Sequence, residues 1–262
     1  MNERAPAKIN VCLFLGPQRP DGRHELVTIF QPIALSDELT LEAAERDEVA
    51  CDGVEGRNLA ADAVAAFRAE TGFAEPVRIT IHKRIPVAGG MAGGSADAAA
   101  TLRLLSRYSG FEPDLLAIAE RLGADVPGQV APARYLATGV GEQLEPLAPV
   151  EPYGVLVLPG PEPLSTAAVF ARAAELGLRR SSEDLAERLA AVRAAGLDLP
   201  DELCVNDLEP AALDLMPEIG DRLDQARAAG ADHVLLSGSG PTVLGLFRDP
   251  RIRTRPPTVT TL

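Results

Sequence analysis

The stretch of this sequence best suited to chemistry on a phosphate group is IPVAGGMAGGSADAA, residues 85–99. Ser95 and an alanine-rich run follow four glycines, at positions 89, 90, 93 and 94. Glycine lets the backbone approach a ligand closely, and the free N–H groups at the start of a helix attract anions. The stretch is not a Walker A loop, because no Gly-Lys-Ser or Gly-Lys-Thr follows it. It predicts a phosphate cradle, and the alternative is a flexible loop with Ser95 as a helix cap.

Two lysines are the next candidates, because every other basic residue of the chain is an arginine. Lys8 and Lys83 are the only lysines among the 25 basic residues. The lysine ammonium is a compact charge, whereas the arginine guanidinium is planar and spread out. A lysine in a chain that otherwise uses arginine therefore points to a position that needs the compact charge. Lys83 ends the run that leads into the glycine-rich stretch, and Lys8 shares a strand face with Asn10. The alternative for both lysines is a solvated surface position.

Two short connections carry further polar groups. Asp125 lies in GADVPG just past an expected helix end, where a carboxylate can act as a general base. The alternative is that Asp125 caps the next helical turn. The run GSGPT at 238–242 follows an apolar strand and can close on a nucleotide. A turn of small residues is the alternative for that run.

Composition restricts the class of protein. The chain has 262 residues and a formal net charge of −13, which argues against binding nucleic acids or anionic lipid surfaces. No apolar run approaches the roughly 18 residues of a membrane span, and the N-terminus lacks the pattern of a signal peptide. The three cysteines are far apart and suit a reducing compartment, and the three histidines lack metal-ligand spacing. We therefore expect a cytoplasmic protein with no nucleic acid and no membrane as partner.

Hydrophobic periodicity predicts the elements that position these groups. It indicates helices at 58–70, 95–107, 113–122, 165–176, 182–195, 209–215 and 218–229. Strands are indicated at 7–15, 25–34, 38–44, 77–83, 134–138, 154–158, 232–238 and 243–247. This mixture predicts an α+β or mixed α/β fold. Prolines 149 and 152 suggest a boundary between domains 1–150 and 151–262.

Three motifs, in this order and spacing, resemble the GHMP small-molecule kinase superfamily. They are PAKIN at 6–10, the glycine–serine stretch at 86–99 and LSGSGPT at 236–242. The runs RPDGRHELVTIFQPIALSDELT, RLGADVPG and GVGE extend the resemblance over about residues 5–247. The resemblance implies an α+β, two-domain GHMP kinase fold. Its N-terminal domain would be ribosomal-protein-S5-like, and its C-terminal domain a ferredoxin-like α/β sandwich.

The resemblance also implies an activity. Members transfer the γ-phosphoryl group of ATP, with Mg²⁺, to a hydroxyl group in a cleft between the two domains. The best motif matches imply a small-molecule substrate that carries a cytidine diphosphate and accepts the phosphoryl on the 2-hydroxyl of its methylerythritol part, in non-mevalonate isoprenoid biosynthesis. The protein would be a monomer or homodimer. The alternatives are a kinase of the same superfamily with another acceptor, and a nucleotide-binding paralogue that no longer catalyses.

Roles for single residues follow from the same resemblance, position by position. Lys8 and Asp125 are the implied catalytic pair, in which Asp125 takes the proton of the acceptor hydroxyl. Asn10, His24 and Phe170 are implied to bind the acceptor, His24 through its ring nitrogens and Phe170 by stacking on the cytosine. No residue is assigned to the metal. The implied ATP-binding residues are Asn58, Lys83, Pro86, Val87, Ala88, Gly89, Gly90, Met91, Ala92, Gly93, Gly94, Ser95 and Ala96.

Three departures from the family pattern lead to further expectations. Arg23 stands where members usually have tyrosine, and a guanidinium can still stack on a base. Ala88 and Ala92 occupy glycine positions, so we expect a negative φ at both. The tail from Arg248 shows no helix or strand pattern. We therefore expect it to be poorly ordered or weakly β, and the C-terminal sandwich to be truncated at its C-terminal edge.

Overall fold

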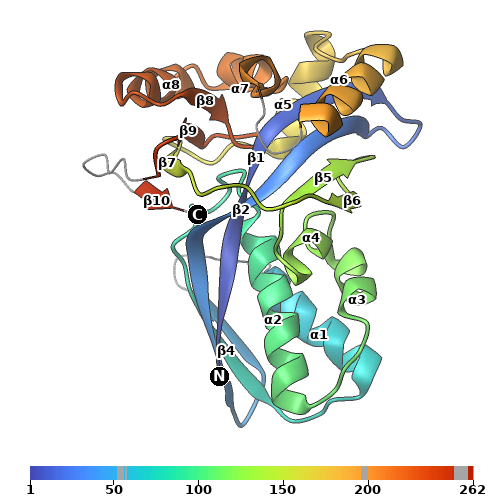
Figure 1. Cartoon of the computed structure of the whole chain (residues 1–262). Coiled ribbons are helices and arrows are strands. Elements are labelled where there is room, and N and C mark those ends of the chain that lie inside the picture. The colour runs from blue at the N-terminus through green and yellow to red at the C-terminus, as the bar shows by residue number, and fades with distance from the viewer. Residues whose placement is uncertain (52–55, 57, 196–199, 251–258, 262) are drawn as a thin grey trace. The chain divides into compact units, whose positions relative to one another are not determined.

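Two long strands dominate the N-terminal part of the computed structural model, which describes residues 1–51, 56, 58–195, 200–250 and 259–261 (Figure 1). They are β1 (Asn2–Gln18) and β2 (His24–Ala43), and they pair with each other. The chain packs into two units, and both strands run through both of them. Unit 1 is Met1–Ala7, Leu35–Val87 and Ala92–Pro132, and unit 2 is Lys8–Ala34, Ala88–Met91 and Ala133–Leu262.

The single strand β2 replaces the two strands that the sequence predicts at 25–34 and 38–44. The expected break fell at the polar residues Ser36 and Asp37, and both are buried within the strand. Asp37 stays in the strand because its carboxylate accepts hydrogen bonds from the backbone N–H groups of Arg84 and Ile85. A polar pair in a strand is therefore compatible with burial when its hydrogen bonds are satisfied.

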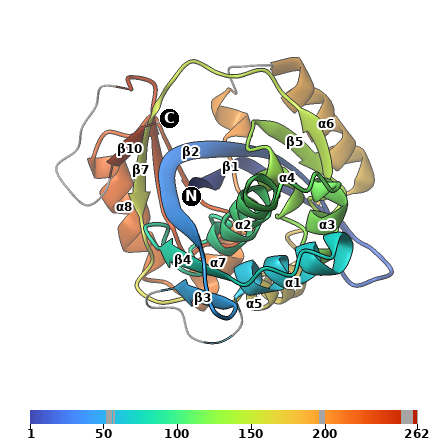
Figure 2. The same cartoon turned by 90° about the horizontal axis from the view of Figure 1, so that it is seen from below.

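In unit 1, part of a six-stranded sheet lies with four helices. The second half of β2 pairs antiparallel with β4 (Val77–His82), which pairs parallel with β3 (Glu48–Cys51). β4 alternates as predicted, with Val77, Ile79 and Ile81 buried. The helix α2 lies among the other helices of this unit (Figure 2). The helices are α1 (Leu59–Thr71), α2 (Gly93–Ser109), α3 (Leu115–Leu122) and α4 (Pro127–Val130).

In unit 2, the first half of β2 pairs antiparallel with β5 (Tyr135–Thr138), which pairs with β6 (Gln143–Pro146). A second, antiparallel sheet has the order β10-β7-β9-β8. Its strands are β7 (Gly154–Leu158), β8 (His233–Leu236), β9 (Val243–Phe247) and β10 (Val259–Thr261). The remaining elements are α5 (Thr166–Glu175), α6 (Ser182–Ala195), the 3₁₀ turn η1 (Asp201–Leu203), α7 (Glu209–Leu215) and α8 (Ile219–Ala228).

The expectation of a missing edge strand is wrong. β10 pairs with β7 and forms one edge of the four-stranded sheet, with Val259 opposite Leu156. The tail is thus partly β, as one of the two expected readings had it, while residues 251–258 and 262 lie outside the described residues. In the part of the chain that the structure describes, no helix combines the length and the apolar composition of a membrane span.

Candidate active site

The glycine-rich segment between β4 and α2 contains more left-handed backbone than expected. Ala88 and Ala92 have φ values of 52° and 54°, so the expectation of negative φ at both is wrong. A left-handed alanine costs roughly 1–2 kcal/mol, which the surrounding packing must offset. α2 begins at Gly93, and its N-cap residue Ala92 makes no side-chain hydrogen bond to the free N–H groups there. Ser95 is therefore the third helical residue and not the N-cap.

In unit 2, the tip of this segment packs against the third motif. The Ser237 hydroxyl donates a hydrogen bond to the Gly90 carbonyl at 3.1 Å. A Cβ added to Gly90 would lie 2.2 Å from the Ser237 carbonyl oxygen. The Lys8 N–H donates to the Met91 carbonyl at 3.2 Å. Unit 2 thus brings together the tip of the glycine segment, the first strand and the LSGSGPT motif.

Asn206 holds the third motif in place, although it lies outside every motif considered in the sequence. Its Nδ2 donates to the carbonyls of Leu236 at 2.8 Å and Gly238 at 2.7 Å, and its Oδ1 accepts from the Leu208 N–H at 2.9 Å. Asn206 is buried, so these three bonds fix the turn that follows β8. The available signal was a polar Asn-Asp pair that follows the apolar run LCV.

Lys8 is not a solvated surface lysine, because its side chain is buried on β1. Its ammonium donates to Asn10 Oδ1 at 3.1 Å and lies 4.1 Å from the centroid of the Phe30 ring. Asn10 Nδ2 in turn donates to the Thr28 hydroxyl at 2.7 Å. The aromatic ring and the amide oxygen stabilise the buried positive charge. Lys8 and Asn10 therefore form one polar chain, as their shared strand face predicts, with Thr28 as an unexpected third member.

Lys83 is also buried from solvent, and two carboxylates surround it. Its ammonium lies 2.5 Å from Asp37 Oδ2 and 2.8 Å from Asp97 Oδ2. Burial by itself lowers the pKa of Lys83, but Asp97 and Asp37 outweigh burial and raise the pKa above its ordinary value. Lys83 therefore keeps its charge at neutral pH. The sequence motifs point to Lys83 but to neither of its partners.

Asp97 makes the stability of the fold pH-dependent. Burial raises the pKa of its carboxyl to about 7, although Lys83 acts in the opposite direction. The folded protein thus binds the proton more tightly than the unfolded chain, so the free energy of unfolding falls as the pH rises from about 4 to about 7. We expect Asp97→Asn to remove this fall, which is about 2–3 kcal/mol between pH 5 and pH 7.5. Urea unfolding at pH 5 and pH 7.5 checks it. An equally steep fall in the variant contradicts the assignment.

Unit 1 holds most of the other predicted site residues. Asn58 is the N-cap of α1, and its Oδ1 accepts from the Ala60 N–H at 2.9 Å. A Cβ on Gly94 would lie 3.9 Å from Leu59, so the starts of α1 and α2 are neighbours. Asp125 is half-buried in the turn between α3 and α4 and is not the N-cap of α4, which is Val126. Asp125 and Lys8 belong to different units, so their pairing stays a prediction.

A cavity of about 640 Å³ in unit 2 brings two of the predicted acceptor-binding residues together. His24 and Phe170 both line it, with their ring centroids 6.2 Å apart and their planes inclined by 37°. His24 Nδ1 lies 3.0 Å from the Gly16 carbonyl oxygen. A carbonyl only accepts, so Nδ1 is the donor of this bond, and in the tautomer with its proton on Nδ1 the other ring nitrogen, Nε2, is an acceptor. The cavity therefore offers aromatic surface and a hydrogen-bond acceptor to a flat ligand.

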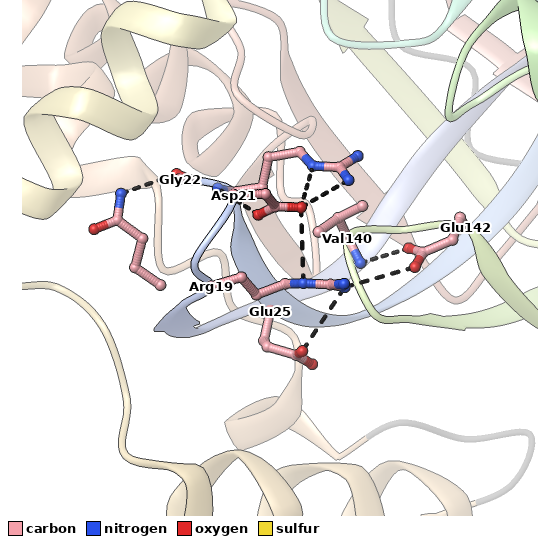
Figure 3. Close-up of polar contacts among 8 residues, drawn as sticks. Arg19, Asp21, Gly22, Glu25, Val140 and Glu142 are labelled. Carbon is pink, nitrogen blue, oxygen red and sulfur yellow. Dashed lines mark hydrogen bonds and ion pairs between the residues drawn. The ribbon is translucent and has the colours of Figure 1, made fainter.

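Arg23 belongs to a group of charged side chains that contact one another near the turn between β1 and β2 (Figure 3). Arg23, which lines the cavity, donates to Asp21 Oδ2 through Nε at 3.0 Å and Nη2 at 2.8 Å. Arg19 lies 3.9 Å from Glu25 and 3.8 Å from Glu142, and the Val140 N–H donates to Glu142 at 2.6 Å (Figure 3). The Asp21 carboxylate thus fixes the orientation of the Arg23 guanidinium.

Comparison with known proteins decides the family. Residues 58–133 match the model of the GHMP kinases N-terminal domain, and residues 177–254 match that of the GHMP kinases C-terminal domain. A curated protein of Streptomyces avermitilis is 40% identical over 94% of this chain and 87% of its own length. The chain belongs to the GHMP kinase family. Among these GHMP kinases, the Streptomyces protein is named 4-diphosphocytidyl-2-C-methyl-D-erythritol kinase.

Other GHMP kinases agree with this assignment. A protein of Thermobifida fusca with the same name is 41% identical over 91% of this chain and 84% of its own length. A crystal structure of 4-(cytidine 5'-diphospho)-2C-methyl-D-erythritol kinase has a TM-score of 0.80 and 36% identity over 95% of this chain and 91% of that chain. A homoserine kinase structure from Cytophaga hutchinsonii, at 20% identity and a TM-score of 0.67 over 94% of this chain and 84% of that chain, shows the fold alone. The predicted α+β GHMP kinase fold is confirmed.

Proposed function

We propose that this GHMP kinase transfers the γ-phosphoryl group of ATP to the 2-hydroxyl of 4-diphosphocytidyl-2-C-methyl-D-erythritol, a step of non-mevalonate isoprenoid precursor biosynthesis. The observation that carries the proposal is the cavity lined by His24 and Phe170, in the unit that also contains Lys8. Relatives with this name cover nearly the whole chain, which supports the same substrate.

The cavity suits a cytosine ring in particular. Phe170 provides a flat apolar surface on which a base stacks. The acceptor nitrogen Nε2 of His24 complements the exocyclic amine of cytosine, which is a donor. Uracil carries a carbonyl oxygen at the same place, and two acceptors facing each other would leave both unpaired. The cavity therefore favours a cytidine group over a uridine group.

For the reaction we propose that Asp125 accepts the proton of the acceptor hydroxyl and that Lys8 lies beside it. Phosphoryl transfer needs positioning and charge neutralisation more than covalent help. The buried ammonium of Lys8 offers a fixed positive charge for the transferred group.

The ATP triphosphate is proposed to lie against residues 86–96, with Asn58 and Lys83 near the nucleotide. The uncapped start of α2 supports this, because its N–H groups suit phosphate oxygens. Among the described residues, no cluster of three or more His, Cys, Asp or Glu side chains forms a cage for a metal. In the proposed reaction, Mg²⁺ would bind mainly through the ATP phosphates and would neutralise part of their charge.

We also propose that the enzyme works in the cytoplasm, as a monomer or homodimer, with small molecules as its ligands. The division into domains 1–150 and 151–262 remains part of this proposal. The two family models lie on either side of that boundary, and the packing units interleave along the chain.

Coupled ADP release from purified protein with ATP and Mg²⁺ tests the function. The acceptors offered are 4-diphosphocytidyl-2-C-methyl-D-erythritol, methylerythritol phosphate, mevalonate and homoserine, and we expect turnover with the first alone. Phe170→Ala should raise the KM for that acceptor about 10- to 100-fold and leave the KM for ATP unchanged, because it removes stacking surface. Turnover with another acceptor would discard the substrate and keep the kinase. ATP binding without any turnover would favour the non-catalytic paralogue.

A further inference from the structure

A buried cluster of three charged residues lies at the two chain ends of the glycine-rich segment. Lys83 follows β4 before the segment, Asp97 lies on α2 after it, and Asp37 comes from β2. The exposed fractions of these side chains are 12% for Lys83, 4% for Asp97 and 0% for Asp37. All three belong to unit 1, so the cluster is formed within one packing unit.

Asp37 fixes the chain as it leaves β4. Its Oδ1 accepts from the backbone N–H groups of Arg84 at 2.5 Å and Ile85 at 2.9 Å, and its Oδ2 accepts from the Lys83 ammonium. Three consecutive residues at the entrance of the glycine segment are therefore bound to one buried carboxylate. Hydrogen bonds that involve a charged group, such as the Lys83 ammonium, are stronger than those between neutral groups. Asp37 therefore holds this part of the backbone tightly.

Asp97 fixes the other end, where α2 begins. Its Oδ2 accepts from the same ammonium at 2.8 Å, while its buried Oδ1 has no hydrogen-bond partner among the described residues. A Cβ on Gly93 would lie 3.2 Å from Lys83 Nζ, so the first residue of α2 packs directly on the ammonium. Lys83 thus joins the strand end to the helix start.

The charge balance of the cluster shows that it is costly. Two carboxylates face one ammonium in a buried site, and one oxygen of Asp97 stays without a partner. Hydrophobic residues of similar volume often stabilise a fold as well as a buried ion pair does. A cluster with this imbalance is better explained by the geometry that it imposes on the backbone on both sides of it.

We propose that Asp37, Lys83 and Asp97 form a brace that sets the spacing between the end of β4 and the start of α2, and so holds the glycine segment in the shape that receives the ATP triphosphate. This inference rests on the proposed ATP-binding function. In the brace, Lys83 is a positioning residue that acts through the backbone. The competing explanation is that Lys83 binds a phosphate directly.

A double-mutant cycle on ATP binding separates these two explanations. The dissociation constant of Mg-ATP is measured by calorimetry, without acceptor, for the wild type, Lys83→Met, Asp97→Asn and the double variant. The brace predicts that each single variant weakens ATP binding about 10- to 100-fold, since small misplacements of a binding group are costly. The double variant should be no weaker than the worse single one, because both changes break the same connection.

Glu3→Gln is the matched control. Glu3 forms a largely buried ion pair with Arg103 of α2, at 3.3 Å, also within unit 1, but it has no bond to the glycine segment. The Glu3→Gln variant should bind Mg-ATP with a dissociation constant within about twofold of that of the wild type. Asp37→Asn serves as a second variant if Asp97→Asn does not fold, and circular dichroism of each variant shows which ones do.

Other results would overturn the brace. Asp97→Asn with wild-type or tighter ATP binding, beside a large loss in Lys83→Met, would make Lys83 a direct phosphate ligand. Losses that add up in the double variant would show two independent roles. A wild type that binds Mg-ATP but phosphorylates no acceptor contradicts the proposed acceptor alone. A wild type that binds no Mg-ATP overturns both the brace and the proposed kinase.

Discussion

Asp125→Asn is expected to lower kcat by about 10²- to 10⁴-fold while the protein stays folded, because an amide cannot accept the proton of the acceptor hydroxyl. The change keeps the size of the side chain, so the KM values for both substrates should move by no more than a few-fold. Lys8→Ala should reduce kcat by a similar factor, because it removes the fixed charge beside the transferred phosphoryl. Steady-state kinetics with circular dichroism on the same samples measures both variants.

Asp114→Asn is the matched control for the Asp125 variant. Asp114 caps α3 through bonds to the Leu116 and Ala117 N–H groups, and asparagine caps helices about as well as aspartate. The same charge is therefore removed from the same unit, with no expected effect on kcat. Near-wild-type turnover of Asp125→Asn or of Lys8→Ala would show that the catalytic pair is wrongly assigned.

Gly90→Ala is expected to have the second-largest effect. Its φ is +73°, and the added Cβ would lie 2.2 Å from the backbone oxygen of Ser237, so a backbone segment must shift. We expect a loss of about 2–4 kcal/mol in the free energy of unfolding, from the collision and from left-handed strain together. kcat/KM for ATP should fall by about 100-fold or more, because the tip of the glycine segment moves. Chemical denaturation and ADP-release kinetics measure the two effects.

Gly110→Ala separates strain from collision. Gly110 ends α2 with a φ of +75°, and a Cβ there would meet nothing within 4 Å. The same left-handed strain, about 1 kcal/mol, should then appear without loss of activity. If the two glycine variants lost the same free energy of unfolding and had the same kcat/KM for ATP, the packing of Gly90 against Ser237 would have no role in activity.

Local pattern predicted the parts of the site that lie within short stretches of sequence. The alternation of β4, the glycine stretch and the shared face of Lys8 and Asn10 are properties of neighbouring residues, so the sequence shows them directly. The Ala88 and Ala92 conformations could not be predicted in this way. Alanine prefers a negative φ, and its left-handed conformation there depends on packing from other segments.

The missed residues share a different cause. Asp37 meets Lys83 across 46 residues, and Asn206 meets Leu236 across 30 residues, so no local window contains both partners. The division of β2 into two strands was wrong for the same reason, since Ser36-Asp37 resembles a turn until the distant N–H groups that bind Asp37 are known. Tertiary contacts override local preference at these positions.

The pairing of β1 has a consequence for how the protein is made. The strand that carries Lys8 leaves the ribosome first, yet the Leu15 N–H finds its acceptor in Asp207, 192 residues later. The Lys8 N–H cannot form its hydrogen bond until the Met91 carbonyl has been synthesised, and the Gly90 carbonyl cannot accept its bond until Ser237 has been synthesised. Such distant closures slow folding and leave an apolar strand exposed while synthesis continues. The earliest-made segment of the site is thus among the last to reach its final surroundings.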